Sequence, residues 1–148
     1  MPQSLSNVLI HLVFSTKDRL PLISESLKPD LHAYLASTSR KIGCECYRVG
    51  GVADHVHIAL RMSRTLTLAK VVEELKSSSS RWAKSQGSAA FYWQSGYGVF
   101  SVSHRDKELL LDYIDRQAEH HRVITFQEEF RRLLEEHEIP FDEKYVWD

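Results

Sequence analysis

The chain has 148 residues, of which 43% are hydrophobic and 26% are charged, and these proportions suit one globular domain over residues 1–148. Its formal net charge is −1, so the overall charge gives no argument for a nucleic-acid partner, and any basic surface must be local. The sequence contains no run of about 18 apolar residues and no basic-then-apolar leader. We therefore expect no membrane span and a cytoplasmic location.

The first half of the chain alternates between strand and helix patterns. In the first strand, apolar residues recur at every second position and His11 lies on the opposite face. Gly50 and Gly51 are expected to turn the second strand into the third, because glycine is typical of tight turns. The patterns predict strands over residues 8–15, 44–49 and 55–60, and a helix from Ser24 or Ser26 to Gly43.

The second half contains three helix patterns and an aromatic stretch. A helix is expected from Thr65 or Thr67 to about Ser85, and the glycine-broken stretch Phe91–Val102 predicts one or two short strands. Two further helices are expected, from Ser103 to about His121 and from the capping box at Thr125 to a point before Pro140. The order β-α-β-β-α-β followed by helices predicts an α+β, ferredoxin-like antiparallel sheet with helices on one face. The other face would be open to a ligand or a second subunit.

The strand Asp54-His55-Val56-His57-Ile58-Ala59-Leu60 contains the first candidate site. Successive strand residues point to opposite faces, so His55 and His57 share the face away from the apolar Val56 and Ile58. Two neighbouring imidazoles can hold one divalent cation. A half-buried strand with two histidines and no ligand is the plainer interpretation of the same pattern.

A second candidate lies in the helix expected from Ser103. Tyr113 and Gln117 are four residues apart, one helical turn, so their side chains lie at adjacent positions on one face. They border an apolar stripe, where a tyrosine usually belongs to a core or an interface and a glutamine is usually solvated. By themselves, these two residues therefore indicate little.

Together, the two stretches resemble one family. Asp54-His55-Val56-His57 is similar to the HUH motif, and Tyr113-x-x-x-Gln117 is similar to the nucleophile helix of the single-tyrosine HUH transposases. That family includes small insertion-sequence transposases and the REP-associated tyrosine transposases. The resemblance extends over most of the chain, through residues 10–19, 92–102 and 139–141.

The resemblance implies a metal-dependent enzyme that cuts and rejoins single-stranded DNA through a covalent 5′-phosphotyrosine. Tyr113 would be the nucleophile, and His55, His57 and Gln117 would hold Mg²⁺ or Mn²⁺. The DNA would have hairpin-containing ends. The family also implies a homodimer, whose active sites could lie within one subunit or be shared between two.

Basic residues that could contact the DNA backbone are found on two predicted elements. Lys17 and Arg19 follow the first strand, and Lys76 and Arg81 belong to the second helix. Trp93 is expected to pack in the core, although aromatic residues in its stretch could stack bases. His120 and His121 are expected to be polar surface residues, with proton transfer as the less favoured role.

Three alternative functions are compatible with parts of the sequence. A histidine-triad nucleotide hydrolase needs a third alternating histidine, where this chain has Ala59. A zinc hydrolase could use Asp54 with the histidines, but the tyrosine helix would then have no role. A domesticated nucleic-acid-binding or nicking protein of the same fold, without transposition activity, is the main alternative.

Overall fold

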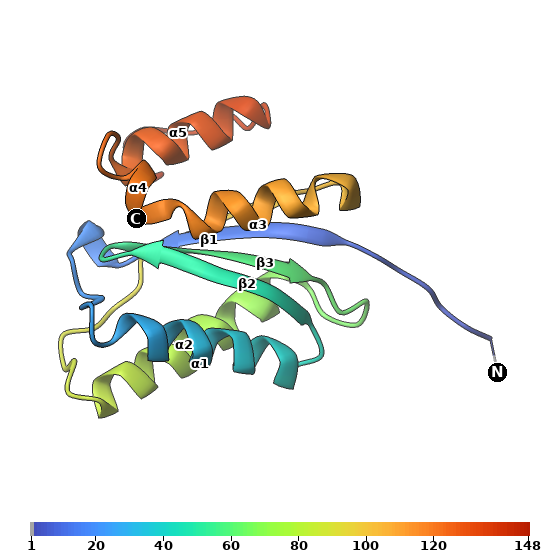
Figure 1. Ribbon diagram of the computed structural model, residues 1–148, viewed down its shortest axis with the longest axis horizontal. Coiled ribbons are helices and arrows are strands. Elements are labelled where there is room, and N and C mark those ends of the chain that lie inside the picture. Colours follow the sequence, from blue (N-terminus) through green and yellow to red (C-terminus); the bar gives the residue numbers. More distant parts are fainter. Residues whose placement is uncertain (1) are drawn as a thin grey trace.

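The computed structural model describes residues 2–148 and contains a four-stranded antiparallel sheet in the order β2-β3-β1-β4 (Figure 1). This is the strand order that a β-α-β-β-α-β chain adopts in a ferredoxin-like fold. The predicted α+β class is therefore confirmed. The strands are β1 (Leu9–Ser15), β2 (Glu45–Val52), β3 (His55–Arg61) and β4 (Gly98–Ser101).

Helices α1 (Lys28–Lys41) and α2 (Leu68–Ser85) cover one side of the sheet, which we call the packed face (Figure 1). The predicted start of α2 is confirmed, because the Thr67 hydroxyl caps the helix by accepting a hydrogen bond from the Lys70 amide. Apolar side chains from every second position of β1 and β3 meet the inward stripes of these helices, as the strand and helix periods require. The cluster includes Leu12, Phe14, Ile58, Leu60, Leu31, Leu35, Val71 and Leu75.

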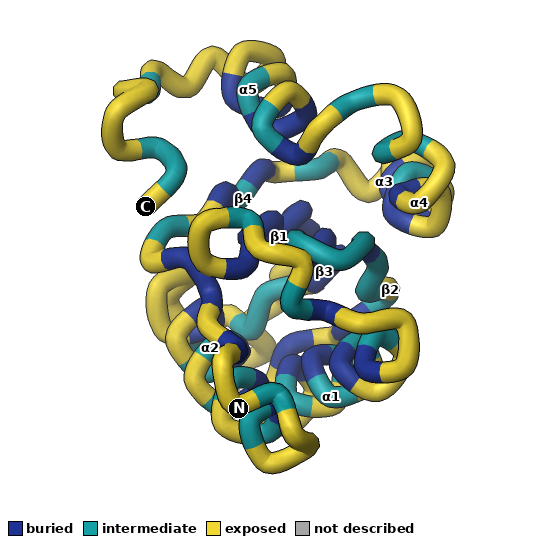
Figure 2. Tube along the Cα trace, turned by 90° about the vertical axis from the view of Figure 1, so that its left-hand side faces the viewer, coloured by how far each residue is buried: buried dark blue, intermediate teal, exposed yellow. Residues whose placement is uncertain are grey.

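The opposite side of the sheet, which we call the site face, is covered and not open. Helices α3 (Lys107–Asp115), α4 (Gln117–His120) and α5 (Phe126–Glu136) lie over it, and Figure 2 shows buried residues on both sides of the sheet. The expectation of an open face was wrong because the last helices have apolar stripes of their own to bury. Ile114 packs near Ala59, and Phe130 packs near Val13.

The turn between β2 and β3 lies at Ala53 and Asp54, not at the two glycines. Strand β2 continues through Gly50 and Gly51 to Val52, which pairs with His55. A Cβ atom at Gly50 would lie 2.6 Å from the carbonyl oxygen of Ile114, so the missing side chain allows α3 to approach the strand closely. The prediction of a turn here was wrong because glycine marks close backbone approach as well as turns.

The helix expected from Ser103 to His121 is divided into shorter pieces. A 3-10 turn η2 (His104–Asp106) precedes α3, and Arg116 interrupts the helical path between α3 and α4. Helix α5 begins as predicted, because the Thr125 hydroxyl accepts from the Glu128 amide at 3.2 Å. The C-terminal tail packs against α5 through Phe141, Val146 and Trp147.

The aromatic stretch before β4 forms part of the core. Trp93 makes an isolated β-bridge with Thr16, and its indole N–H donates to the Ser79 hydroxyl at 2.9 Å. This confirms the expected core position of Trp93. Within residues 2–148, no helix is both long enough and apolar enough to cross a bilayer.

Candidate active site

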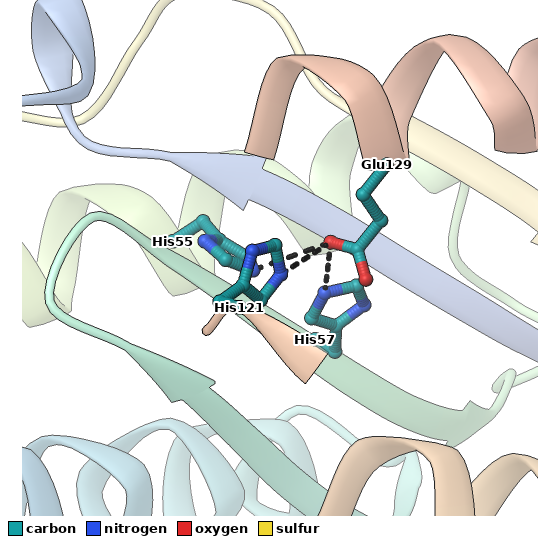
Figure 3. Close-up of side chains that lie close together, drawn as sticks. All are labelled: His55, His57, His121 and Glu129. Carbon is teal, nitrogen blue, oxygen red and sulfur yellow. Dashed lines mark hydrogen bonds and ion pairs between the residues drawn. The ribbon is translucent and has the colours of Figure 1, made fainter. Parts of the chain in front are cut away.

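The two histidines of β3 point together toward the helices of the site face (Figure 3). Both are fully buried, and their ring centroids are 5.0 Å apart. His55 donates from Nδ1 to Asp54 Oδ1 at 2.7 Å, while Nδ1 of His57 is hydrogen-bonded to Nε2 of His11 on β1 at 2.7 Å. Strand alternation therefore places the pair as predicted, and His11 supports it from the neighbouring strand.

A carboxylate that the sequence analysis missed lies at the centre of this site. Glu129 of α5 is 1% exposed, and its Oε1 atom is 3.0 Å from His57 Nε2 and 3.3 Å from His55 Nε2 (Figure 3). Burial alone would raise the pKa of Glu129, but hydrogen bonds with His121, His55 and His57 hold it well below its ordinary value. The site therefore contains a buried, ionised carboxylate.

His121 also belongs to the site, so the expectation of a surface position was wrong. Its side chain is 9% exposed, and Nε2 lies 3.1 Å from Glu129 Oε1 and 3.0 Å from Gln117 Oε1. It lies there because α4 ends just before it and the chain turns back toward α5. His120 is more exposed, at 27% of its side chain, with Nε2 3.3 Å from Glu129 Oε2.

One signal in the sequence could have identified Glu129. Phe126, Glu129, Phe130 and Leu133 follow the i, i+3, i+4, i+7 spacing of one stripe of α5, and all are buried. A charged residue inside an apolar helical stripe requires a partner, because an unpaired buried charge is costly. His121 gave no comparable signal.

The side chains of Tyr113 and Gln117 approach the two histidines from the helices that cover the site face. The Tyr113 hydroxyl donates to Glu129 Oε2, and the Gln117 side chain donates from Nε2 to the same oxygen at 3.1 Å. Gln117 Oε1 lies 3.0 Å from His55 Nε2. The structure thus brings the predicted tyrosine, glutamine and both histidines together within one chain, although the predicted continuous helix between Tyr113 and Gln117 is broken.

The titration behaviour of the site follows from burial and from Glu129. Burial and then the Glu129 charge raise the pKa of Tyr113, so its phenol stays protonated in this arrangement. Burial lowers the pKa of His57 to about 4. It also opposes protonation of His55, but hydrogen bonds with Asp54 and Glu129 outweigh it and raise the pKa of His55 to about 9.

The donor atoms of the cluster are close enough to share a cation. One ligand atom from each of four residues, His55, His57, His121 and Glu129, lies within 4.8 Å of the others. Opposite ligands of a metal ion are about 4.2 Å apart, twice a metal–nitrogen bond. Imidazole nitrogen with carboxylate or carboxamide oxygen is also a ligand set that divalent metals accept.

Two surface pockets border the cluster. One, of about 520 Å³, is lined by Asp54 and His121 together with two basic residues, Arg19 and Arg122. The other, of about 370 Å³, is lined by residues that include Tyr113 and His120. A ligand could therefore approach the buried site from either side of α4.

The four basic residues predicted to contact DNA lie in different surroundings. Lys17 is exposed in the 3-10 turn η1 (Lys17–Arg19), and Arg19 lines the larger pocket. Arg81 is exposed on α2, across the sheet from the histidines. The Lys76 ammonium donates to the carbonyls of Gln94, Ser95 and Gly96, so it holds the segment before β4 against α2.

A model of the family described as "Transposase IS200 like" matches residues 4–117. The chain belongs to that family. The matched segment includes His55, His57, Tyr113 and Gln117, whereas His121 and Glu129 lie beyond it. The IS200-like assignment identifies the chain as a transposase, an enzyme class that cuts and transfers DNA strands.

Solved structures share the fold of this IS200-like chain. A protein of Deinococcus radiodurans R1, assigned as a transposase, matches with a TM-score of 0.62 and 22% identity, over 79% of this chain and 98% of its own. A REP-associated tyrosine transposase bound to a REP hairpin matches with a TM-score of 0.61 and 13% identity, over 82% and 72% of the two chains. No curated protein matches the chain.

Proposed function

We propose that this chain is a metal-dependent transposase of single-stranded DNA, which cuts and rejoins strands through a covalent 5′-phosphotyrosine at Tyr113. One observation supports this most strongly. In a chain of the IS200-like family, the Tyr113 hydroxyl, the Gln117 amide and the imidazoles of His55 and His57 meet in a single buried site.

His55, His57 and Gln117 are the residues we propose to hold the cation, Mg²⁺ or Mn²⁺. Their donor atoms are two imidazole nitrogens and a carboxamide oxygen, with Gln117 Oε1 already 3.0 Å from His55 Nε2. Bound there, the cation would draw charge from a phosphate oxygen and orient the phosphorus for in-line attack.

Tyr113 supplies the attacking oxygen in this proposal. Its phenol oxygen forms a bond to phosphorus while the bond from phosphorus to the 3′ oxygen breaks, leaving a 5′-phosphotyrosine and a 3′-OH. Overall, the phenol loses its proton and the leaving 3′ oxygen gains one. The hydrogen bond from Tyr113 to Glu129 orients the phenol before attack. Because the new phosphodiester keeps the energy of the old one, attack by a 3′-OH reverses the step and rejoins a strand.

The DNA partner is proposed to be a single strand with hairpin-containing ends. The structural neighbour bound to a REP hairpin supports a hairpin as the probe to use first. Arg19 lines the pocket beside His121, and Lys17 belongs to the same 3-10 turn, so both would contact the strand that enters the site. Arg81, exposed on α2, would contact DNA farther from the site. For Lys76, a DNA contact would have to replace bonds to three carbonyls.

A homodimer is proposed from the edges of the sheet. Strands β2 and β4 are the edge strands, and unpaired edges can pair with another chain. Because α3, α4 and α5 cover the site face, that face does not offer the open surface for a second subunit that the sequence suggested. Because the side chains of Tyr113 and Gln117 meet His55 and His57 of the same chain, we propose active sites within one subunit and not shared between two.

The phosphotyrosine proposal is tested by Tyr113→Phe. This change retains the ring and removes the attacking oxygen, so the covalent protein–DNA adduct on single-stranded hairpin oligonucleotides should disappear while DNA binding persists. Tyr145→Phe, in the exposed tail, is the matched control and should form the adduct normally. Cleavage by the Tyr113→Phe protein would instead indicate a water nucleophile, and hence a nuclease. A wild-type protein that binds DNA without cutting it would favour the domesticated alternative.

A further inference from the structure

We infer that His121 and Glu129 are two further ligands of the metal site, which would then contain three imidazoles and a carboxylate beside the Gln117 carboxamide and would prefer Mn²⁺ to Mg²⁺. The inference rests on the proposed function in placing a cation beside His55 and His57. Both added ligands follow residue 117, where the family match ends. They therefore lie outside the part of the chain that the family model describes.

The first support is the convergence of donor atoms. His55, His57 and His121 all direct the same ring nitrogen, Nε2, toward Glu129 Oε1, at 3.3, 3.0 and 3.1 Å (Figure 3). These nitrogens come from β3 and from the segment after α4, and the carboxylate comes from α5. A cation bound here would replace the present hydrogen bonds with coordinate bonds from the same nitrogen and oxygen atoms.

The second support is the set of partners on the other ring nitrogen. Nδ1 of His55 donates to the Asp54 carboxylate at 2.7 Å, and Nδ1 of His121 donates to the Ile124 carbonyl at 2.9 Å. Nδ1 of His57 is hydrogen-bonded to His11. Metal-bound histidines usually have such an outer partner, which fixes the tautomer and directs the other nitrogen to the metal. His121 shares this arrangement with the two predicted ligands.

The third support is the placement of the Glu129 carboxylate. Its Oε1 atom faces the three imidazoles, and its Oε2 atom accepts from the Tyr113 hydroxyl and from Gln117. A buried carboxylate is costly unless it is paired or coordinates a metal. Through its two oxygens, Glu129 would tie the cation to the attacking group, so that binding of metal also orders Tyr113.

The added ligands change the metal that the site prefers. Mg²⁺ favours an octahedral shell of oxygen atoms and retains several waters, whereas the transition-metal ion Mn²⁺ accepts imidazole nitrogen more readily than Mg²⁺ does. Three imidazoles with one carboxylate therefore favour Mn²⁺ over Mg²⁺. Two imidazoles and a carboxamide would discriminate less between the two ions.

The test is a titration of the full chain with Mn²⁺, without DNA, in which electron paramagnetic resonance measures the unbound ion. Glu129→Gln and His121→Ala should each weaken Mn²⁺ binding by about 10- to 100-fold or more. The matched controls are Glu128→Gln and His104→Ala, both at exposed positions outside the cluster, and both should bind as wild type. An excess of Mg²⁺ should displace Mn²⁺ from Glu129→Gln and from His121→Ala more readily than from wild type.

The outcomes separate this inference from the proposed function. Wild-type Mn²⁺ affinity in Glu129→Gln and His121→Ala, with binding lost in His55→Ala, would overturn the inference and leave the transposase proposal intact. Equal displacement by Mg²⁺ in all proteins would overturn the metal preference. Formation of the covalent DNA adduct at Tyr113, measured in a separate assay, tests the proposed phosphotyrosine chemistry. If His121→Ala does not fold, His121→Gln provides the second variant, since its amide is of similar size but lacks the imidazole nitrogens.

Discussion

The two faces of one sheet have different composition although the same strands supply both. On β3, Val56, Ile58 and Leu60 belong to the packed face, while His55 and His57 belong to the site face, and all five are fully buried. Strand alternation produces the segregation, since neighbouring residues point to opposite sides. The comparison shows that the stabilising core and the candidate chemistry can be built independently on the two sides of a single strand.

The two faces also differ in the energetics of burying their side chains. The packed face gains about 25 cal/mol for each Å² of apolar surface removed from water. The site face buries His11, His55, His57 and Glu129, and such polar groups must be hydrogen-bonded to be tolerated. Such an arrangement contributes little to stability compared with apolar packing, so its presence points to function.

The largest expected effect on stability is a truncation in the packed face. Leu75→Ala, at a fully buried position on α2, should lower the free energy of unfolding by about 2–5 kcal/mol through lost burial and a cavity. Adduct formation per folded molecule should be unchanged, because Leu75 touches the packed cluster and not the site. Urea unfolding measures the first quantity and oligonucleotide trapping the second.

Leu109→Ala is the control for that change, since Leu109 is 70% exposed and its truncation should stay within about 0.5 kcal/mol of wild type. A large loss of adduct in folded Leu75→Ala protein would show that the two faces are coupled.

Gly50→Ala tests how closely the site face is fitted to the sheet. The added Cβ would lie 2.6 Å from both the carbonyl oxygen and Cγ2 of Ile114, the residue after Tyr113. Helix α3 must shift, at a cost of about 1–3 kcal/mol, and the displaced Tyr113 should form adduct more slowly. Stability from urea unfolding and the single-turnover rate of adduct formation are the measurements. A normal rate in a destabilised protein would mean that the position of Tyr113 does not depend on this contact.

The same comparison explains which features could be predicted from sequence. The fold and the histidine pair follow from local periods, because alternation over β3 and the helical stripe of α2 are visible in a few residues. Glu129 meets His57 across 72 positions of the chain, and no local pattern encodes that contact. The break at Arg116 was also missed, because neither glycine nor proline occurs there.

The smallest expected effect is a change in DNA affinity, caused by a substitution in the pocket beside the site. Arg19 lines the pocket beside His121, so it is placed to contact a phosphate of a strand entering the site. Arg19→Ser should weaken single-stranded DNA binding and reduce the slope of log affinity against log salt by about 1, the loss of one phosphate contact. Arg64→Ser is the control, because Arg64 is exposed and follows β3 at the end of the strand farthest from His55. An unchanged slope for Arg19→Ser would exclude that pocket from the DNA path. Equal changes in both variants would show that the DNA spans the length of the sheet.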